Sequence, residues 1–508
     1  MQSSILRFLT VFVLGATLHN PVFAQSQSRV WADVTPQELI FMANFILRVV
    51  PEHGLYLTPS EEQLIERLRM AKDLEALRPT VISLYKMTAR QIYSGRLIPT
   101  KVSPDIRFAK KTITDENLRK MLFDSKGSME QLIFAVAPKF ADYRMLLKLL
   151  SRLRNLEMEE PWGKLEIKKA LKFEMSQPVV VKVKRRLVAL GFTIDSMDER
   201  FDEQTVAAIN DIQRQNKSNP DGILSPNKAT QKYLETPLIQ RIEQVRADLE
   251  KIRWLPQEPK PKYIFVNLAF SSFLLVDFSR ANPVVFNFKT INGRVKRKTP
   301  SMVDRIHQVV FNPFWTVPKT IFIEDKIPLI QDMTRAQMNQ YFQENNYIVV
   351  SSDYRRRLDP NSINWWRVES ADSGFFIRQL PNYFNALGVV RFSLTNKEAI
   401  FLHDTGEREL FFEENRILSS GCVRLEKPIE LAEYLLAGTN WDRYAIENTV
   451  TQPGEVLEKE TPVTLKTPME VYLLPVTSHL SADGVMRFTT DVYGHNESIR
   501  SQLNSLFF

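Results

Sequence analysis

Cysteine is almost absent from this 508-residue sequence, which has one, Cys422. A lone thiol cannot form an intramolecular disulfide, so no disulfide framework is expected. Zinc sites draw on several Cys and His ligands, but there is no second Cys and the histidines make no H-x-x-x-H spacing, so we expect no metal. Neither G-x-x-x-x-G-K-[ST] nor G-x-G-x-x-G occurs, and we therefore predict no nucleotide or other cofactor.

Long apolar runs and basic clusters are also missing. No segment after the N-terminus approaches eighteen uninterrupted apolar residues, so we expect no transmembrane segment in the mature chain. A formal charge of +8 is small for this length, and no basic cluster is interleaved with aromatics, so nucleic acid is not an expected partner.

The N-terminus has the pattern of a secretory signal peptide, which we assign to residues 1–24. Arg7 precedes an apolar run at 8–18, and Val22-Phe23-Ala24 resembles a cleavage site before Gln25. The mature protein is therefore expected in a periplasm, with an uncleaved anchor as the alternative.

The remaining chain is too long for one hydrophobic core, and we predict a multi-domain α+β protein. Helix starts at Thr35-Pro36 and Thr58-Pro59 favour a helical scaffold domain over 25–175. Residues 176–236 predict a small module of three short helices. Residues 237–262 are expected to form a charged helix, with Arg241, Glu250 and Lys251 on solvated faces, followed by a Pro-rich linker.

After this linker the hydrophobic period changes to two, which predicts a mainly β domain over 263–445. Helical and polar segments interrupt the pattern at about 321–376, as an insertion of the kind that forms active-site lids. Residues 446–508 are expected to be a C-terminal extension, with a hairpin around Asp483-Gly484 that completes the catalytic sheet.

The chemistry is expected at Cys422, which lies nineteen positions after His403. A thiolate is a strong nucleophile, and an imidazole can take its proton and pass it to a leaving amine. Gly421 allows close backbone approach, and the amides of Gly421 and Cys422 are expected to face a developing oxyanion. Either the backbone carbonyl or the carboxylate of Asp404 would hold the imidazole ring. The alternative is that Cys422 is a small buried apolar residue.

Several motifs together carry a family resemblance. They are Arg253-Trp254-Leu255-Pro256, Asn312-Pro313-Phe314-Trp315, Asn385-Ala386-Leu387-Gly388, Leu402-His403-Asp404-Thr405 and Ser419-Ser420-Gly421-Cys422-Val423-Arg424. The sequence with these motifs resembles the L,D-transpeptidases with a YkuD-type catalytic domain, specifically their large periplasmic subgroup. Residues 176–236 resemble the peptidoglycan-binding module of cell-wall enzymes. Met197-Asp198-Glu199-Arg200 departs from that module, where an Asp-Gly turn is usual.

The resemblance implies Cys422 as nucleophile and His403 as base. Substrate-binding candidates are Trp315, Ser420, Arg424, Asn385 and Phe401, although packing or loop support is the alternative for Trp315 and Arg424. Phe401 stands where the subgroup often has Tyr, and Lys427 where the family often has Asn, so the contacts of those two groups are not expected here.

The implied reaction forms direct cross-links between diaminopimelate residues of peptidoglycan, from tetrapeptide donor stems, through a thioester on Cys422. Carbapenems are expected to acylate the same sulfur. The implied partners are peptidoglycan stem peptides, together with carboxypeptidases or synthases of the wall. Hydrolysis or protein attachment by the same thioester, and a non-catalytic wall-binding scaffold, remain alternatives.

Overall fold

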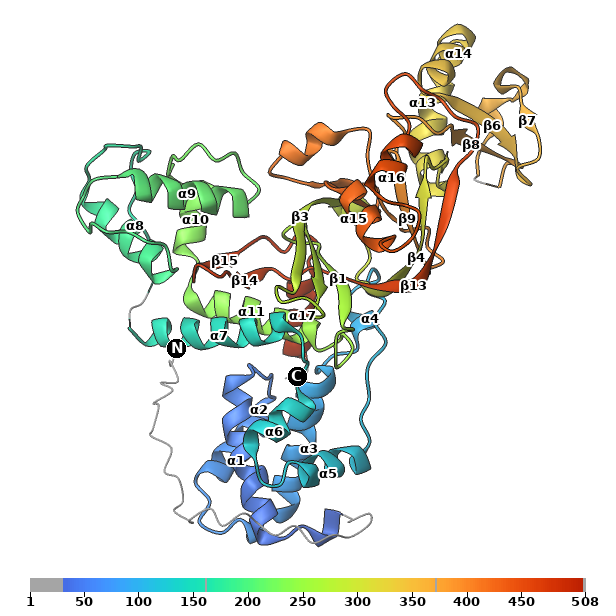
Figure 1. The fold of residues 1–508 in the computed structure, drawn as a ribbon. Helices are drawn as coiled ribbons and strands as arrows, with labels where there is room; N and C mark the ends of the chain where they lie inside the picture. The colour runs from blue at the N-terminus through green and yellow to red at the C-terminus, as the bar shows by residue number, and fades with distance from the viewer. Residues whose placement is uncertain (1–30, 160–161, 371, 506–508) are drawn as a thin grey trace.

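The computed structural model describes residues 31–159, 162–370 and 372–505 (Figure 1). The signal peptide expected at 1–24 lies outside these ranges. Within them, no helix is both long and apolar enough to cross a membrane. The described chain has a helical N-terminal region, a helical module and a mostly β region, which confirms the multi-domain α+β class.

The N-terminal region is built from helices. They are α1 (Pro36–Glu52), α2 (Pro59–Arg69), α3 (Arg78–Ser94), α4 (Pro99–Val102), α5 (Asp115–Asp124), α6 (Met129–Val136) and α7 (Ala141–Glu159). Helices α1 and α2 begin where the sequence predicts, because Thr35 and Thr58 each form a capping box with the glutamate three residues later.

The small module contains α8 (Pro178–Ala189), α9 (Glu203–Gln215) and α10 (Ala229–Glu235). The buried ammonium of Lys184 stabilises the atypical turn at residues 197–200. This group donates to Asp198 at 2.8 Å and to Asp202 at 2.5 Å. Asp198 also accepts from the Arg200 amide, so an ion pair holds a turn that an Asp-Gly sequence would form by backbone conformation alone.

Helix α11 (Leu238–Ile252) corrects one expectation, because Arg241, Glu250 and Lys251 are all buried. The helix packs against α7, and Figure 1 shows it between the module and the β region. Its charges are paired inside the protein. The Lys251 ammonium lies 2.7 Å from Asp248, and the Glu250 carboxylate accepts from the Leu97 amide. The charge pattern indicated a surface helix because sequence does not reveal such partners.

The β region is organised around one sheet of nine strands in the described part of the chain, in the order β11-β3-β12-β10-β9-β4-β13-β1-β2. Their bounds are β1 (Lys262–Asn267), β2 (Ser272–Asp277), β3 (Val284–Gly293), β4 (Met302–Phe311), β9 (Val390–Leu394), β10 (Leu402–His403), β11 (Ile417–Ser419), β12 (Val423–Leu425) and β13 (Thr461–Leu474). Helices α15 (Pro428–Leu435) and α16 (Arg443–Thr449) contribute Leu431 and Ile446 to its core.

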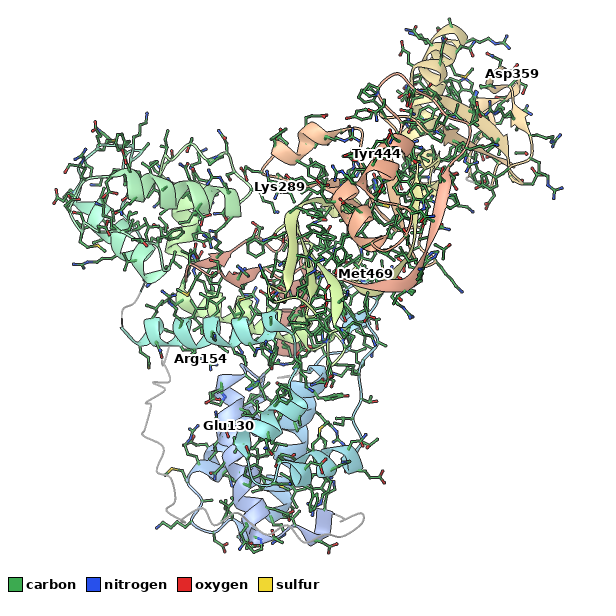
Figure 2. The ribbon with its side chains drawn as sticks, in the orientation of Figure 1. Glu130, Arg154, Lys289, Asp359, Tyr444 and Met469 are labelled. Atoms are coloured by element: carbon green, nitrogen blue, oxygen red, sulfur yellow. The ribbon has the colours of Figure 1, made fainter. Side chains whose placement is uncertain are left out.

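The expected insertion forms a separate layer with its own apolar core. It contains β5 (Trp315–Thr316), α12 (Lys319–Ile321), the π-helical turn η4 (Phe322–Lys326), α13 (Ile327–Gln331), α14 (Arg335–Glu344), β6 (Tyr347–Ser351), β7 (Arg357–Leu358) and β8 (Phe375–Gln379). Its four strands pair in the order β5-β8-β6-β7. Figure 2 labels Asp359 here, at the opposite end of the molecule from Glu130 of the helical region.

The C-terminal hairpin does not join the nine-stranded sheet, which corrects the prediction that it completes that sheet. Strands β14 (Ser478–Leu480) and β15 (Met486–Phe488) pair only with each other, and helix α17 (His495–Ser505) follows. Strand β13 instead lies inside the large sheet, parallel to β1 and antiparallel to β4. The hairpin turn at Asp483-Gly484 was recognisable, but the distant partners of β13 were not.

Candidate active site

His403 ends strand β10, and Cys422 directly precedes β12, the neighbouring strand. Strands β10 and β12 run parallel, with Leu402 opposite Val423 and His403 opposite Arg424. Leu402 and Val423 are fully buried in the sheet core. Because side chains alternate along a strand, the residues on either side of this pair share the opposite face. Those residues are Phe401, His403, Cys422 and Arg424.

The ring of His403 is held by its own neighbour in sequence. Its Nδ1 is hydrogen bonded to the Asp404 carbonyl oxygen. Since a carbonyl oxygen only accepts, Nδ1 carries the proton and Nε2 is left as the basic nitrogen. Burial, with Arg424 adding to it, lowers the pKa of His403 to about 3, so the ring is neutral at pH 7.

The Cys422 thiol is partly exposed, and its sulfur accepts from the Phe401 amide at 3.4 Å. It also lies 3.6 Å from the Ala399 carbonyl oxygen, to which the thiol donates. Burial raises the pKa of the thiol, while the Phe401 amide and the guanidiniums of Arg424 and Arg391 act in the opposite direction. The resting site therefore contains a protonated thiol beside a neutral imidazole.

A short turn presents the sulfur to the open face. The Ser419 hydroxyl donates to the Cys422 carbonyl at 2.6 Å and accepts from the Gly421 amide at 3.2 Å. Gly421 has a φ of +122°, which L side chains rarely adopt. Its amide is already bonded to Ser419. In the described residues the Cys422 amide has no such acceptor, so it is the better placed of the two to face an oxyanion.

The side chain of Asp404 points away from the imidazole. Its carboxylate accepts from the Val389 amide at 2.9 Å and from Arg408. Burial raises the pKa of this carboxyl, and Arg408 opposes the change. Of the two ring-holding groups considered from sequence, the structure thus uses the backbone carbonyl of Asp404.

Arg424 on β12 and Ser420 in the turn before it both have polar partners at the rim of the site. Arg424 forms an ion pair with Glu407 at 2.6 Å. Ser420 is exposed, and its hydroxyl accepts from Arg297 at 3.2 Å. Arg297 also forms a two-point ion pair with Asp325 of η4, at 2.6 and 2.7 Å. This guanidinium therefore connects the cysteine loop to the insertion.

Of the remaining candidates, Asn385 and Trp315 have no hydrogen bond to the Cys422 sulfur in the described residues, whereas Phe401 has one. Asn385 is fully buried, and its amide group bonds the Leu380 carbonyl and the Leu387 amide, so it orders the loop after β8. Trp315 is half-buried on β5 and packs on the core of the insertion, with its ring centroid 6.4 Å from that of Tyr347. Phe401 contributes its amide to the sulfur, and its ring lies beneath Arg391.

Within the described ranges, no group of three or more His, Cys, Asp or Glu side chains could hold a metal ion. The site contains a thiol, an imidazole and a backbone amide without an acceptor, a set of groups that can support acyl transfer through a covalent intermediate.

Two parts of the chain match known protein families. Residues 261–452 match the family model described as the L,D-transpeptidase catalytic domain, and residues 176–230 match the "putative peptidoglycan binding domain". These matches confirm the resemblance read from the sequence: the chain contains an L,D-transpeptidase catalytic domain preceded by a peptidoglycan-binding domain.

A curated relative is named "Putative L,D-transpeptidase", from Haemophilus influenzae, and is 34% identical over 240 residues. The match covers 46% of this chain and 45% of the relative, so the chain spans about half of that protein's length. Solved L,D-transpeptidase structures from Xylanimonas cellulosilytica and Stackebrandtia nassauensis are 12% and 13% identical, with TM-scores of 0.19 and 0.23. They cover 60% and 61% of this chain, and 98% and 96% of their own chains are matched.

Three residues near the site were not singled out from sequence: Ser419, Arg297 and Arg391. Ser419 had a local signal, because a Ser two residues before a glycine often bonds that amide in a turn. Arg391 interrupts the buried pattern of Val390 and Phe392, which marks it as facing out of the sheet core. Arg297 had no signal, because its partners are distant in sequence.

Proposed function

We propose that the protein is a peptidoglycan L,D-transpeptidase that forms direct diaminopimelate–diaminopimelate cross-links in the periplasm. The observation that carries this proposal is the placement of Cys422 and His403 on one face of adjacent parallel strands, within the matched catalytic domain. Parallel strands lie about 4.8 Å apart and rise about 3.3 Å per residue, so positions that are diagonal to each other are about 8 Å apart at Cα, within side-chain reach.

The first half-reaction is acylation of the thiol. The Cys422 sulfur attacks the carbonyl carbon between diaminopimelate and the terminal D-alanine, and the thiol proton moves to His403 Nε2. The Cys422 amide donates to the resulting oxyanion, a contact typically worth roughly 3 kcal/mol of the barrier. The C–N bond then breaks, the imidazolium gives its proton to the D-alanine amine, and a thioester remains.

The second half-reaction transfers the acyl group. The side-chain amine of a second diaminopimelate attacks the thioester, His403 takes a proton from that amine, and the sulfur leaves and is protonated again. The new amide has the same bond type as the broken one, so no nucleotide is required. The peptidoglycan-binding domain would keep the catalytic domain close to its polymeric substrate.

Muropeptide analysis of sacculi incubated with the protein tests this function. We expect new cross-links between two diaminopimelate residues, absent with Cys422→Ala, and a carbapenem adduct of one molecule per wild-type chain by intact-mass spectrometry. Shortened stems without cross-links would indicate hydrolysis, and stems joined to protein would indicate attachment. Cross-links that persist with Cys422→Ala would refute the thioester mechanism, while sacculus binding without any reaction would favour the scaffold.

A further inference from the structure

Two arginines lie between the large sheet and the insertion without an acidic partner. Arg391 is on β9, directly opposite His403, and Arg378 is on β8. Both are half-buried, and the Nε of each is buried with no hydrogen-bond partner. Across the described residues, neither guanidinium forms an ion pair, although unpaired buried charge is costly.

Aromatic rings hold these guanidiniums without occupying their N–H donors. Arg378 lies 3.7 Å from the ring centroid of Phe314, and Arg391 lies 5.1 Å from that of Phe401. The neighbouring acid, Glu460, accepts from the Phe314 amide at 3.2 Å and pairs with neither arginine. Both cations therefore keep donors for an anion from outside the protein.

Other arginines around the site differ in this respect. Arg408 is paired with Asp404, Arg424 with Glu407, and Arg297 with Asp325. Of these five arginines, only Arg378 and Arg391 have no carboxylate partner among the described residues.

The position of Arg391 places such an anion beside the reacting atoms. As the strand partner of His403, it shares the sheet face of the ring and of Cys422. Burial and Arg424 lower the pKa of the imidazole, and the charge of Arg391 adds to that effect. Burial raises the pKa of the thiol, and Arg391 opposes that rise together with Phe401 and Arg424. Burial lowers the pKa of Arg391, Glu460 opposes that change, and Arg378 is close enough to add to it.

We propose that Arg391, supported by Arg378, binds the C-terminal carboxylate of the donor stem peptide. This inference rests on the proposed function and specifies how the donor is recognised. In a tetrapeptide the terminal carboxylate is two bonds from the scissile amide nitrogen, so its binding site must lie next to Cys422. One further residue would displace that carboxylate by about 3.8 Å. The pair therefore selects stems that end one residue after diaminopimelate.

The test compares two donor peptides, a tetrapeptide with a free C-terminal carboxylate and the same peptide with a C-terminal carboxamide. Their binding is measured by calorimetry on full-length Cys422→Ala protein, so that no reaction interferes. We expect the acid to bind roughly 10- to 100-fold more tightly, as for a charge-assisted hydrogen bond. Adding Arg391→Gln should remove the difference, Arg378→Gln should reduce it, and Arg391→Lys should restore part of it.

Arg335→Gln is the matched control, because Arg335 is an exposed residue of the insertion that bonds Asn361. It should leave the preference for the acid intact. Equal binding of acid and amide to the parent protein, or binding of neither, would overturn the carboxylate site. A second outcome separates the two proposals. If the acid binds more tightly than the carboxamide but the wild-type protein releases no D-amino acid, the carboxylate site stands and the proposed transfer reaction is refuted.

Discussion

Replacing Gly421 by alanine tests whether backbone conformation positions the Cys422 sulfur for the proposed acylation. The obstacle is not space, because a Cβ there would meet the Ile400 side chain at 3.4 Å, an ordinary contact. It is the φ of +122°, which is far from the left-handed well near +57°. Retaining that conformation costs about 2–3 kcal/mol, whereas relaxing it rotates the peptides that Ser419 bonds.

We expect relaxation, and a shift of about 1 Å at the sulfur can lower a rate by about 10²-fold. The assay is the rate of carbapenem acylation followed by intact-mass spectrometry, with Tm measured in parallel. Gly438→Ala is the control, since Gly438 has a φ of +77° with nothing within 4 Å of its added Cβ. It should cost about 1 kcal/mol of stability and leave acylation unchanged. Acylation of Gly421→Ala at the wild-type rate would refute the argument.

Three further outcomes follow from the site and its surroundings. Burial lowers the pKa of both His53 and His403 to about 3, below the unfolded value of about 6.5. Protons therefore bind the unfolded chain preferentially, and the free energy of unfolding, complete above pH 6.5, falls as pH decreases towards 3. Tm should drop between pH 7 and pH 5, and the drop should be smaller in a His53→Gln variant. Arg297→Gln should free the insertion from the cysteine loop and increase proteolysis within 321–376, whereas unchanged cleavage would show that packing alone holds it. Ser419→Ala removes two hydrogen bonds, worth roughly 1–3 kcal/mol together. The increase in the activation free energy of acylation should exceed the loss in the free energy of unfolding that the change in Tm reports.

The parts of the fold that sequence predicted were local. Capping boxes at Thr35 and Thr58 identified helix starts because all their partners lie within three residues. Strand β13 could not be placed this way, since its partners on β1 and β4 lie 150 or more residues earlier in the sequence. The burial of Lys251 was missed for the same reason: its charge is compensated by a helix neighbour and by the distant Pro475 carbonyl.

For the candidate site, too, the sequence predicted the local motifs but not the contacts between distant segments. Local motifs contained Cys422 and His403, but only strand register shows that they share one face of the sheet. The choice between the carbonyl and carboxylate of Asp404 depended on Val389 and Arg408, which compete for the carboxylate. Sequence does not specify which of these hydrogen bonds forms.

The Cys422 thiol and the His403 imidazole are both neutral at rest, and this leads to a prediction about the reactivity of the thiol. Burial favours the thiol over the thiolate and the imidazole over the imidazolium, so at pH 7 the proton stays on sulfur. A small electrophile such as iodoacetamide brings no oxyanion for the Cys422 amide and no carboxylate for Arg391. Its alkylation rate should therefore be slow at pH 7 and increase steadily beyond pH 9.

A carbapenem does present a carbonyl to that amide, so charge on its oxygen is stabilised while His403 removes the thiol proton. Acylation by a carbapenem should accordingly proceed at pH 7, with a much flatter pH profile than alkylation. Rates of both reactions measured on one protein sample between pH 6 and pH 10 provide the comparison. Parallel profiles with a plateau below pH 7 would mean that the sulfur is already ionised at rest, and the assignment of His403 as a base acting only during attack would have to be abandoned.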